Sequence, residues 1–186
     1  MAAAPYDHAL RIADELRRTL THTSREEGLA LVEAILAARG VFCSGQGRSG
    51  LMVKAFAMRL VHLGLNAHVV GETTTPAIGP GDLLVAATGS GRTRTTLAIV
   101  EAAQERGARV ACLTAQPDSP IASAANLVVE LHGPISGHAP DGKSIQPPGS
   151  LFEQALLICC DAVVMALIER LGTTEEEMRA RHTKLE

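Results

Sequence analysis

The chain has 186 residues, of which 46% are apolar and 20% are charged, and its formal net charge is −3. This length fits one domain with a sizeable buried core. The acidic balance and the lack of any run of Lys or Arg exclude a nucleic-acid groove, and with three Phe, one Tyr and no Trp there are few platforms on which bases could stack.

Two helices are predicted before the first strand. Across residues 6–20, apolar side chains recur on one helical face, and charged side chains, Glu15 among them, occupy the other. Ser24 with Glu27 three residues later has the spacing of a capping box, which predicts a second helix through Ala38. The N-terminus lacks the basic lead and apolar core of a secretory signal, so a cytoplasmic protein is expected.

The rest of the chain alternates strands and helices. The runs LLVAA and LVV show no polar alternation, as expected for strands buried on both faces of a parallel sheet. This alternation predicts the α/β class with a doubly wound sheet. Five strands are predicted, over residues 41–43, 67–70, 82–87, 109–113 and 126–131.

A Gly- and Pro-rich loop over 132–149 precedes a long helix from Leu151 to about Leu171, and a short helix closes the chain. Residues 1–186 are therefore expected to form one domain. Its expected parts are N-terminal helices over 6–38, an α/β core over 41–131 and C-terminal helices over 151–182.

No membrane span is predicted. The longest apolar stretch, 155–168, contains Asp161 and is too short to cross a bilayer. The cysteines lie in apolar runs without CxxC spacing and are expected to be reduced core residues of a cytoplasmic protein, although a reactive vicinal pair is an alternative. They are Cys43, Cys112, Cys159 and Cys160.

A glycine-rich turn at Gly45–Gly50 (GQGRSG) carries the strongest functional signal. It follows a strand and opens a helix, so that free backbone N–H groups and the positive end of the helix dipole point at one place, where an anion can bind. The turn also fits GxGxxG, and Glu72 lies about twenty residues on, as a dinucleotide-binding (Rossmann) unit requires. Two helices ahead of the turn count against that interpretation.

A second glycine-rich turn, TGSGRT at 88–93, follows the third predicted strand. In a doubly wound sheet the first and third strands can be neighbours, so we expect both turns to meet in one crevice. Two hydroxyl-rich turns suit one monophosphate better than an extended dinucleotide. The simpler alternative is that both are only tight turns that need glycine.

Three further features have plain interpretations. Residues 137–144 (GHAPDGKS) fit the phosphate-loop pattern by chance, because no strand leads into them and prolines follow. His62 by itself is more typical of a satisfied core histidine than of a catalyst, and no histidine cluster has metal-ligand spacing. Ser150 and Glu153 fit a capping box for the long helix.

Six segments taken together resemble the sugar isomerase (SIS) family, and within it the 6-phospho-3-hexuloisomerases. The resemblance covers nearly the whole chain. The segments are GQGRSG (45–50), MRLVHLG (58–64), VGETTTPAI (70–78), TGSGRT (88–93), GSLFEQ (149–154) and RHTKLE (181–186).

This resemblance implies a flavodoxin-like three-layer α/β/α fold with a five-stranded parallel sheet. It also implies a homo-tetramer that needs no cofactor or metal and converts 3-hexulose 6-phosphate to fructose 6-phosphate. Glu153 would be the catalytic base, and His62, from its own or a neighbouring subunit, would handle the sugar oxygens. The small-molecule phosphosugar would be bound by Gly47, Arg48, Ser49, Thr88, Gly89, Ser90 and Thr93.

Two departures from the family pattern concern the second turn. Thr88 replaces the usual serine and keeps the hydroxyl, whereas Arg92 stands where relatives have Glu or Thr, which leaves the substrate open. The alternatives are another phosphosugar isomerase, such as an arabinose 5-phosphate isomerase, and a phosphosugar-sensing module without catalytic activity. The first usually carries extra domains, and the second needs a DNA-binding segment.

Overall fold

A computed structural model describes residues 4–132 and 144–185. Five parallel strands form one sheet in the order β2-β1-β3-β4-β5. This is the flavodoxin-like order, in which β1 and β3 are neighbours at the centre. The strands are β1 (Val41–Gly45), β2 (Ala67–Val69), β3 (Leu83–Thr88), β4 (Arg109–Thr114) and β5 (Leu127–Glu130).

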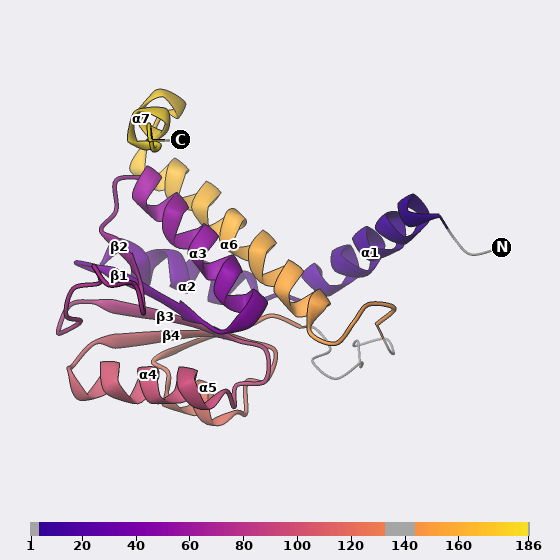
Figure 1. Ribbon diagram of the computed structural model, residues 1–186, viewed down its shortest axis with the longest axis horizontal. Coiled ribbons are helices and arrows are strands. Elements are labelled where there is room, and N and C mark those ends of the chain that lie inside the picture. The colour runs from indigo at the N-terminus through magenta and orange to yellow at the C-terminus, as the bar shows by residue number, and fades with distance from the viewer. Residues whose placement is uncertain (1–3, 133–143, 186) are drawn as a thin grey trace.

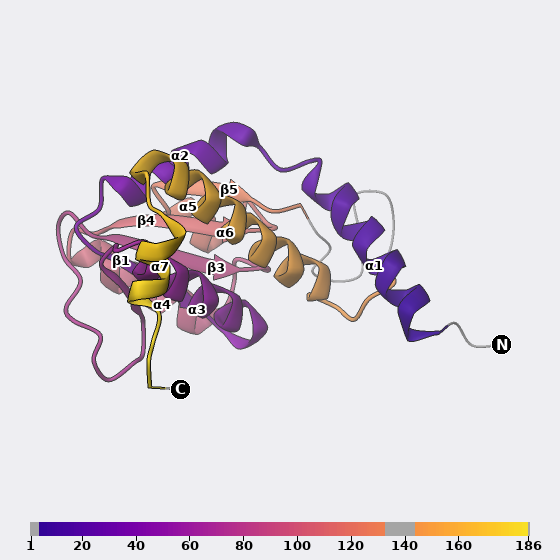
Figure 2. The same cartoon turned by 90° about the horizontal axis from the view of Figure 1, so that it is seen from above.

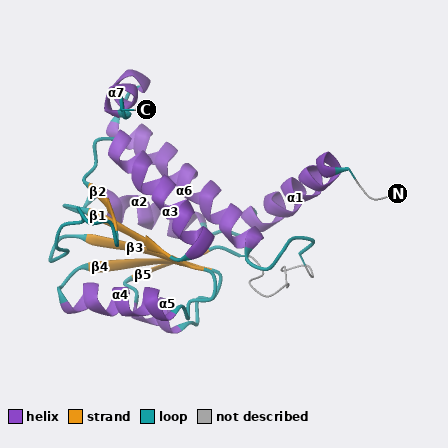
Figure 3. Ribbon diagram, in the orientation of Figure 1, coloured by secondary structure: helices purple, strands orange, loops and turns teal. Residues whose placement is uncertain are grey.

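Helices cover both faces of the sheet, so the protein has the predicted three layers (Figures 1 and 3). One face carries α2 (Arg25–Leu36), α3 (Gly47–His62) and α6 (Ser150–Leu171). The opposite face carries α4 (Arg94–Glu105) and α5 (Pro120–Ala124). The remaining helices are α1 (Pro5–Leu20) and α7 (Glu175–Arg181).

The core follows from the continuous apolar runs of the central strands. Every residue of β3 is buried, and its side chains alternate between the two helical layers. Phe56 of α3 and Phe152 of α6 are each only 1% exposed on the first face, and burying such a ring contributes about 1.5–3 kcal/mol. The sheet and its two helical layers therefore fix where the strand ends and helix starts lie.

Element boundaries differ from the predicted ones by one or two residues at most strand ends. The largest difference is in β1, which extends through Ser44 and Gly45 because both pair with β3. The capping box at Ser24 is only half formed. The Ser24 hydroxyl accepts the amide N–H of Glu27 at 3.3 Å, but the Glu27 carboxylate accepts the amide N–H of Glu130 in β5 at 2.7 Å.

Helix α6 confirms the long helix predicted from Leu151 to about Leu171, and it extends beyond the apolar stretch 155–168 at both ends. It has 22 residues, and an 18-residue window of mean hydropathy 2.1 makes it long and apolar enough to cross a membrane by length and composition alone. The expectation that the stretch is too short is therefore wrong. In the fold, Phe152, Leu156, Cys160 and Leu167 of this helix are buried in the core, which accounts for its apolar composition.

Helix α1 projects away from the sheet (Figure 2). The apolar face predicted for it is largely uncovered, with Tyr6 73% and Leu10 53% exposed. Glu15, which the sequence places on the charged face opposite, is buried, as is Thr19. Polar side chains therefore make the buried contacts of this helix.

Candidate active site

A polar hollow of about 150 Å³ lies where β1 and β3 end. The two strands are neighbours in register, with Gly45 paired to Ala87, so the two glycine-rich turns that follow them meet as predicted. The hollow is lined by Gln46, Ser49, Ala87, Thr88, Gly89, Ser90, Thr93, Gly149, Phe152 and Glu153.

Three helices begin at this hollow. Gln46 is the N-cap of α3, Thr93 is the N-cap of α4 and Gly149 is the N-cap of α6, and all three residues line it. Each helix start offers unpaired backbone N–H groups and the positive end of a dipole. The hollow is therefore suited to an anion, and three converging helix starts are more than tight turns alone would need.

The second turn presents hydroxyl groups to the hollow. The hydroxyl oxygens of Thr88 and Thr93 are 3.2 Å apart, which is within hydrogen-bonding distance. The amide N–H of Gly91 donates to the Thr88 hydroxyl, also at 3.2 Å. The Thr93 hydroxyl makes no cap bond to its own helix. The amide N–H of Arg92 donates to the Ser90 hydroxyl at 3.3 Å, while the Arg92 side chain is exposed.

The first turn depends on its glycines for close packing. A Cβ atom at Gly50 would lie 2.6 Å from the carbonyl oxygen of Gly45, so only glycine lets α3 start this close to β1. Gly47 has a φ of +57°, in the left-handed region that favours glycine. These constraints place Ser49, which is 9% exposed, against the hollow.

Glu153 is not a capping-box residue. Helix α6 is capped by Gly149 with a φ of +86° and without a side-chain bond, so Ser150 is already its first helical residue. The Glu153 carboxylate is paired with the guanidinium of Arg48, with Nε and Oε2 2.9 Å apart. A carboxylate that lines a hollow suited to an anion and does not cap the helix is available for proton transfer.

His62 does not line the hollow. It is the last residue of α3, whereas Ser49 is in the first turn, and 13 residues at 1.5 Å each separate them by about 20 Å. His62 is buried beside His182, with ring centroids 4.9 Å apart, and Arg181 donates to its carbonyl oxygen at 3.1 Å. Burial, followed by the nearby His182 and Arg59, lowers the pKa of His62.

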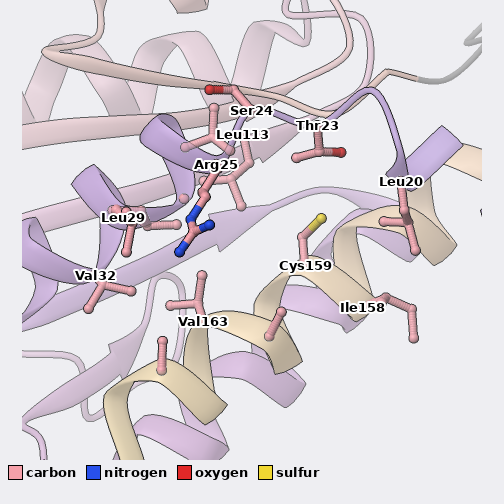
Figure 4. A pocket seen from close by; sticks show the side chains of 15 residues that line it. Leu20, Thr23, Ser24, Arg25, Leu29, Val32, Leu113, Ile158, Cys159 and Val163 are labelled. Carbon is pink, nitrogen blue, oxygen red and sulfur yellow. The ribbon is translucent and has the colours of Figure 1, made fainter. Parts of the chain in front are cut away.

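A larger groove of about 440 Å³ lies between α2 and α6 (Figure 4). Apolar side chains such as Leu29, Ile158 and Val163 line most of it. Arg25 and Cys159 also line it. Its lining residues include no cluster of acid and hydroxyl groups comparable to that of the smaller hollow. On chemical grounds the smaller hollow is the candidate active site, although the groove is larger.

Comparisons with known proteins agree with this architecture. A model of the SIS domain matches residues 34–158, which include both glycine-rich turns and Glu153. The chain belongs to the SIS domain family. It is 41% identical to the 3-hexulose-6-phosphate isomerase of Bacillus subtilis, over 97% of this chain and 98% of the relative, and 42% identical to that of Mycobacterium gastri, over 94% and 88%.

A solved SIS-fold structure is similar over nearly its full length. It is a hypothetical protein from Methanococcus jannaschii, whose structure was taken to infer the function of a 3-hexulose-6-phosphate isomerase. The identity is 30%, the TM-score is 0.83, and the alignment covers 97% of this chain and 99% of that protein. A likeness of this extent includes the sheet and the helices that cover its two faces.

The strand order of the sheet argues against the alternative of a dinucleotide-binding (Rossmann) unit. A classic Rossmann sheet has the strand order 3-2-1-4-5-6, with β1 beside β4, whereas here β1 lies beside β3. The acid that would bind the ribose, Glu72, is instead paired with Lys54 at 2.8 Å. The phosphate-loop match falls mostly outside the described residues, since 137–143 are not among them.

Sequence reasoning missed four residues of the hollow: Gln46, Ala87, Gly149 and Phe152. Gln46 lies within the first glycine motif, Ala87 directly precedes the second, and the other two flank the predicted start of α6, so proximity to these motifs could have found them. Of the residues predicted to bind phosphate, Gly47 and Arg48 lie in the first turn beside the hollow without lining it.

Proposed function

We propose that the protein is a 3-hexulose-6-phosphate isomerase, which interconverts 3-hexulose 6-phosphate and fructose 6-phosphate. The single observation that supports it most is the hollow itself, where a carboxylate, Glu153, stands beside two hydroxyl-lined turns and three helix starts. The four relatives of that name, with 34–42% identity over 80% or more of their length, support the same activity.

The reaction moves a carbonyl from C3 to C2 through an enediol. Glu153 takes the proton from C2 as the C3 carbonyl oxygen gains a proton, and a C2–C3 double bond forms. The C2 hydroxyl then loses its proton, C2 becomes the carbonyl, and Glu153 returns its proton to C3. One carboxylate serves for both carbon transfers, and the ion pair with Arg48 holds it beside the hollow.

The phosphate of the substrate binds where the helices begin. Ser49, Ser90 and Thr93 donate hydroxyl hydrogen bonds to it, with Thr88 and the backbone of Gly89 completing the cradle. Such bonds are charge-assisted and anchor the sugar at a distance from the reacting carbons, so that the binding energy fixes their position relative to Glu153.

The proton lost by the C2 hydroxyl balances the proton gained by the C3 oxygen, and a hydrogen-bond donor is needed beside these oxygens during the exchange. Arg48 of the same chain supplies a guanidinium N–H that stays protonated throughout. His62 serves only from a neighbouring subunit of a homo-tetramer, because its own hollow is about 20 Å away along α3. The exposed Tyr6 and Leu10 of α1 and the apolar groove beside α6 support such an assembly.

A cytoplasmic location completes the proposal. All four cysteines are free thiols, and three of them are buried, which suits a reducing compartment.

A turnover assay tests the activity. Purified protein is incubated with 3-hexulose 6-phosphate, and fructose 6-phosphate is measured as the expected product. Arabinose 5-phosphate serves as the comparison substrate, because Arg92 departs from the family pattern. Faster turnover of arabinose 5-phosphate would overturn the assignment in favour of another phosphosugar isomerase, and no turnover of either sugar would favour a sensing module. Light scattering tests the tetramer.

A further inference from the structure

Glu15 of α1 is tied to the segment that leads into α6. Its carboxylate accepts three hydrogen bonds from three consecutive residues: the Ser144 hydroxyl at 3.0 Å, the Ile145 amide N–H at 3.1 Å and the Gln146 side-chain amide at 3.0 Å. Glu15 is 8% exposed. The segment lies beside α1 in both views of the fold (Figures 1 and 2).

The same network continues to the residue next to Glu153. The side-chain amide of Gln154 donates to the side-chain oxygen of Gln146 at 2.8 Å. The backbone between them closes the start of α6, since the Ser150 amide donates to the carbonyl oxygen of Pro147 at 3.1 Å. A chain of hydrogen bonds thus runs from Glu15 to the first turn of α6.

We propose that Glu15 is a positioning residue for Glu153, which holds the 144–149 segment and through it the first turn of α6. This inference rests on the proposed function for its effect on turnover. The segment 144–149 that leads into α6 has no helix or strand of its own, and contacts that hold Ser144, Ile145 and Gln146 come from Glu15 of α1. Glu15 is one of the two buried residues of α1, so the contact also holds the helix.

Both carboxylate oxygens of Glu15 must act as hydrogen-bond acceptors in this contact. All three partners donate, and a carboxylate can accept from each of them. The substitution Glu15→Gln keeps nearly the same shape but turns an NH₂ group toward at least one donor, which leaves a partly buried donor without an acceptor. A double variant that combines Glu15→Gln with Gln146→Glu pairs donors with acceptors again. The carboxylate introduced at position 146 would accept from the side-chain amides at positions 15 and 154.

The test compares these variants with Asp14→Asn, which removes the same charge from an exposed site on the same helix. Steady-state kinetics with 3-hexulose 6-phosphate should show kcat reduced about 10- to 100-fold in Glu15→Gln, as a slight misplacement of a catalytic group produces. KM should stay within about threefold, since the hydroxyl groups that bind the phosphate lie on α3 and the second turn, away from the loosened segment. The double variant should recover kcat, and Asp14→Asn should match the wild type.

Hydrogen–deuterium exchange gives a readout that needs no turnover. In Glu15→Gln, amides 144–146 and 150–154 should exchange faster than in the wild type, and in the double variant they should be protected again. A kcat within about twofold of the wild type, or unchanged exchange at 150–154, would overturn the proposal. If the wild type itself does not isomerise the sugar, the proposed function fails, while the exchange at 150–154 still decides whether Glu15 holds α6. If Glu15→Gln does not fold, the folded double variant with low kcat would also contradict the proposal.

Discussion

Replacing Gly50 by alanine tests whether the first turn depends on close packing of α3 against β1. The new Cβ atom would lie 2.6 Å from the carbonyl oxygen of Gly45, whereas ordinary contact begins at 3.4 Å, so the helix and strand must separate by about 0.8 Å. Overpacking against backbone costs about 3 kcal/mol at the upper end of its usual range. Alanine recovers about 1 kcal/mol through its higher helix propensity, which leaves a net loss of about 2 kcal/mol.

Gly28 in α2 provides the matched control for this substitution. A Cβ atom there meets nothing within 4 Å, so Gly28→Ala should stabilise the protein by up to about 1 kcal/mol. At equal protein concentration, thermal unfolding should show Tm about 4–8 °C lower in Gly50→Ala and about 2–4 °C higher in Gly28→Ala. The reasoning is refuted if Gly50→Ala is as stable as the wild type, or if both variants shift in the same direction.

Three further predictions concern single groups. Thr93→Val keeps the shape of the side chain but removes its hydroxyl, so calorimetry should find inorganic phosphate bound about tenfold more weakly, and unchanged affinity would remove Thr93 from the cradle. The pKa of His62 is lowered from 6.5 in the fold, so the unfolded chain binds more protons than the folded chain as the pH drops through 6.5. The free energy of unfolding should therefore fall over this pH range, and His62→Asn should flatten the dependence. Burial raises the pKa of Cys43 and of Cys112 to about 12, so neither thiol should react with a disulfide reagent at pH 8 until the protein unfolds, and rapid labelling of either in the native state would contradict its burial.

The sequence predicts the sheet well because its signals are local. Uninterrupted apolar runs mark the strands, and glycines mark where they end, so the class and the meeting of the two turns are confirmed. Strand ends differ because pairing decides them, as when β3 draws Ser44 and Gly45 into β1.

The candidate site depends more on contacts between distant residues. The S-x-x-E pattern at Ser150 predicts a cap for α6, but the N-cap is Gly149, whose backbone is left-handed. Glu153 therefore forms an ion pair with Arg48 instead of capping the helix. The burial of Glu15 could not be predicted, because its partners lie 129–131 residues away in the sequence. The distance of His62 from the hollow, in contrast, follows from helix geometry alone.

The most direct test of the account is solvent exchange at C3 of fructose 6-phosphate. In D₂O, wild-type protein should replace the C3 proton with deuterium, as seen by NMR, and leave the C1 protons in place, because the proposed enediol spans C2 and C3. Glu153→Gln, which keeps the shape but not the basicity of the carboxylate, should fold, bind fructose 6-phosphate and exchange C3 at least about 100-fold more slowly. Near-normal C3 exchange in a folded Glu153→Gln protein would contradict the role of Glu153, and exchange at C1 in the wild type would contradict the proposed reaction.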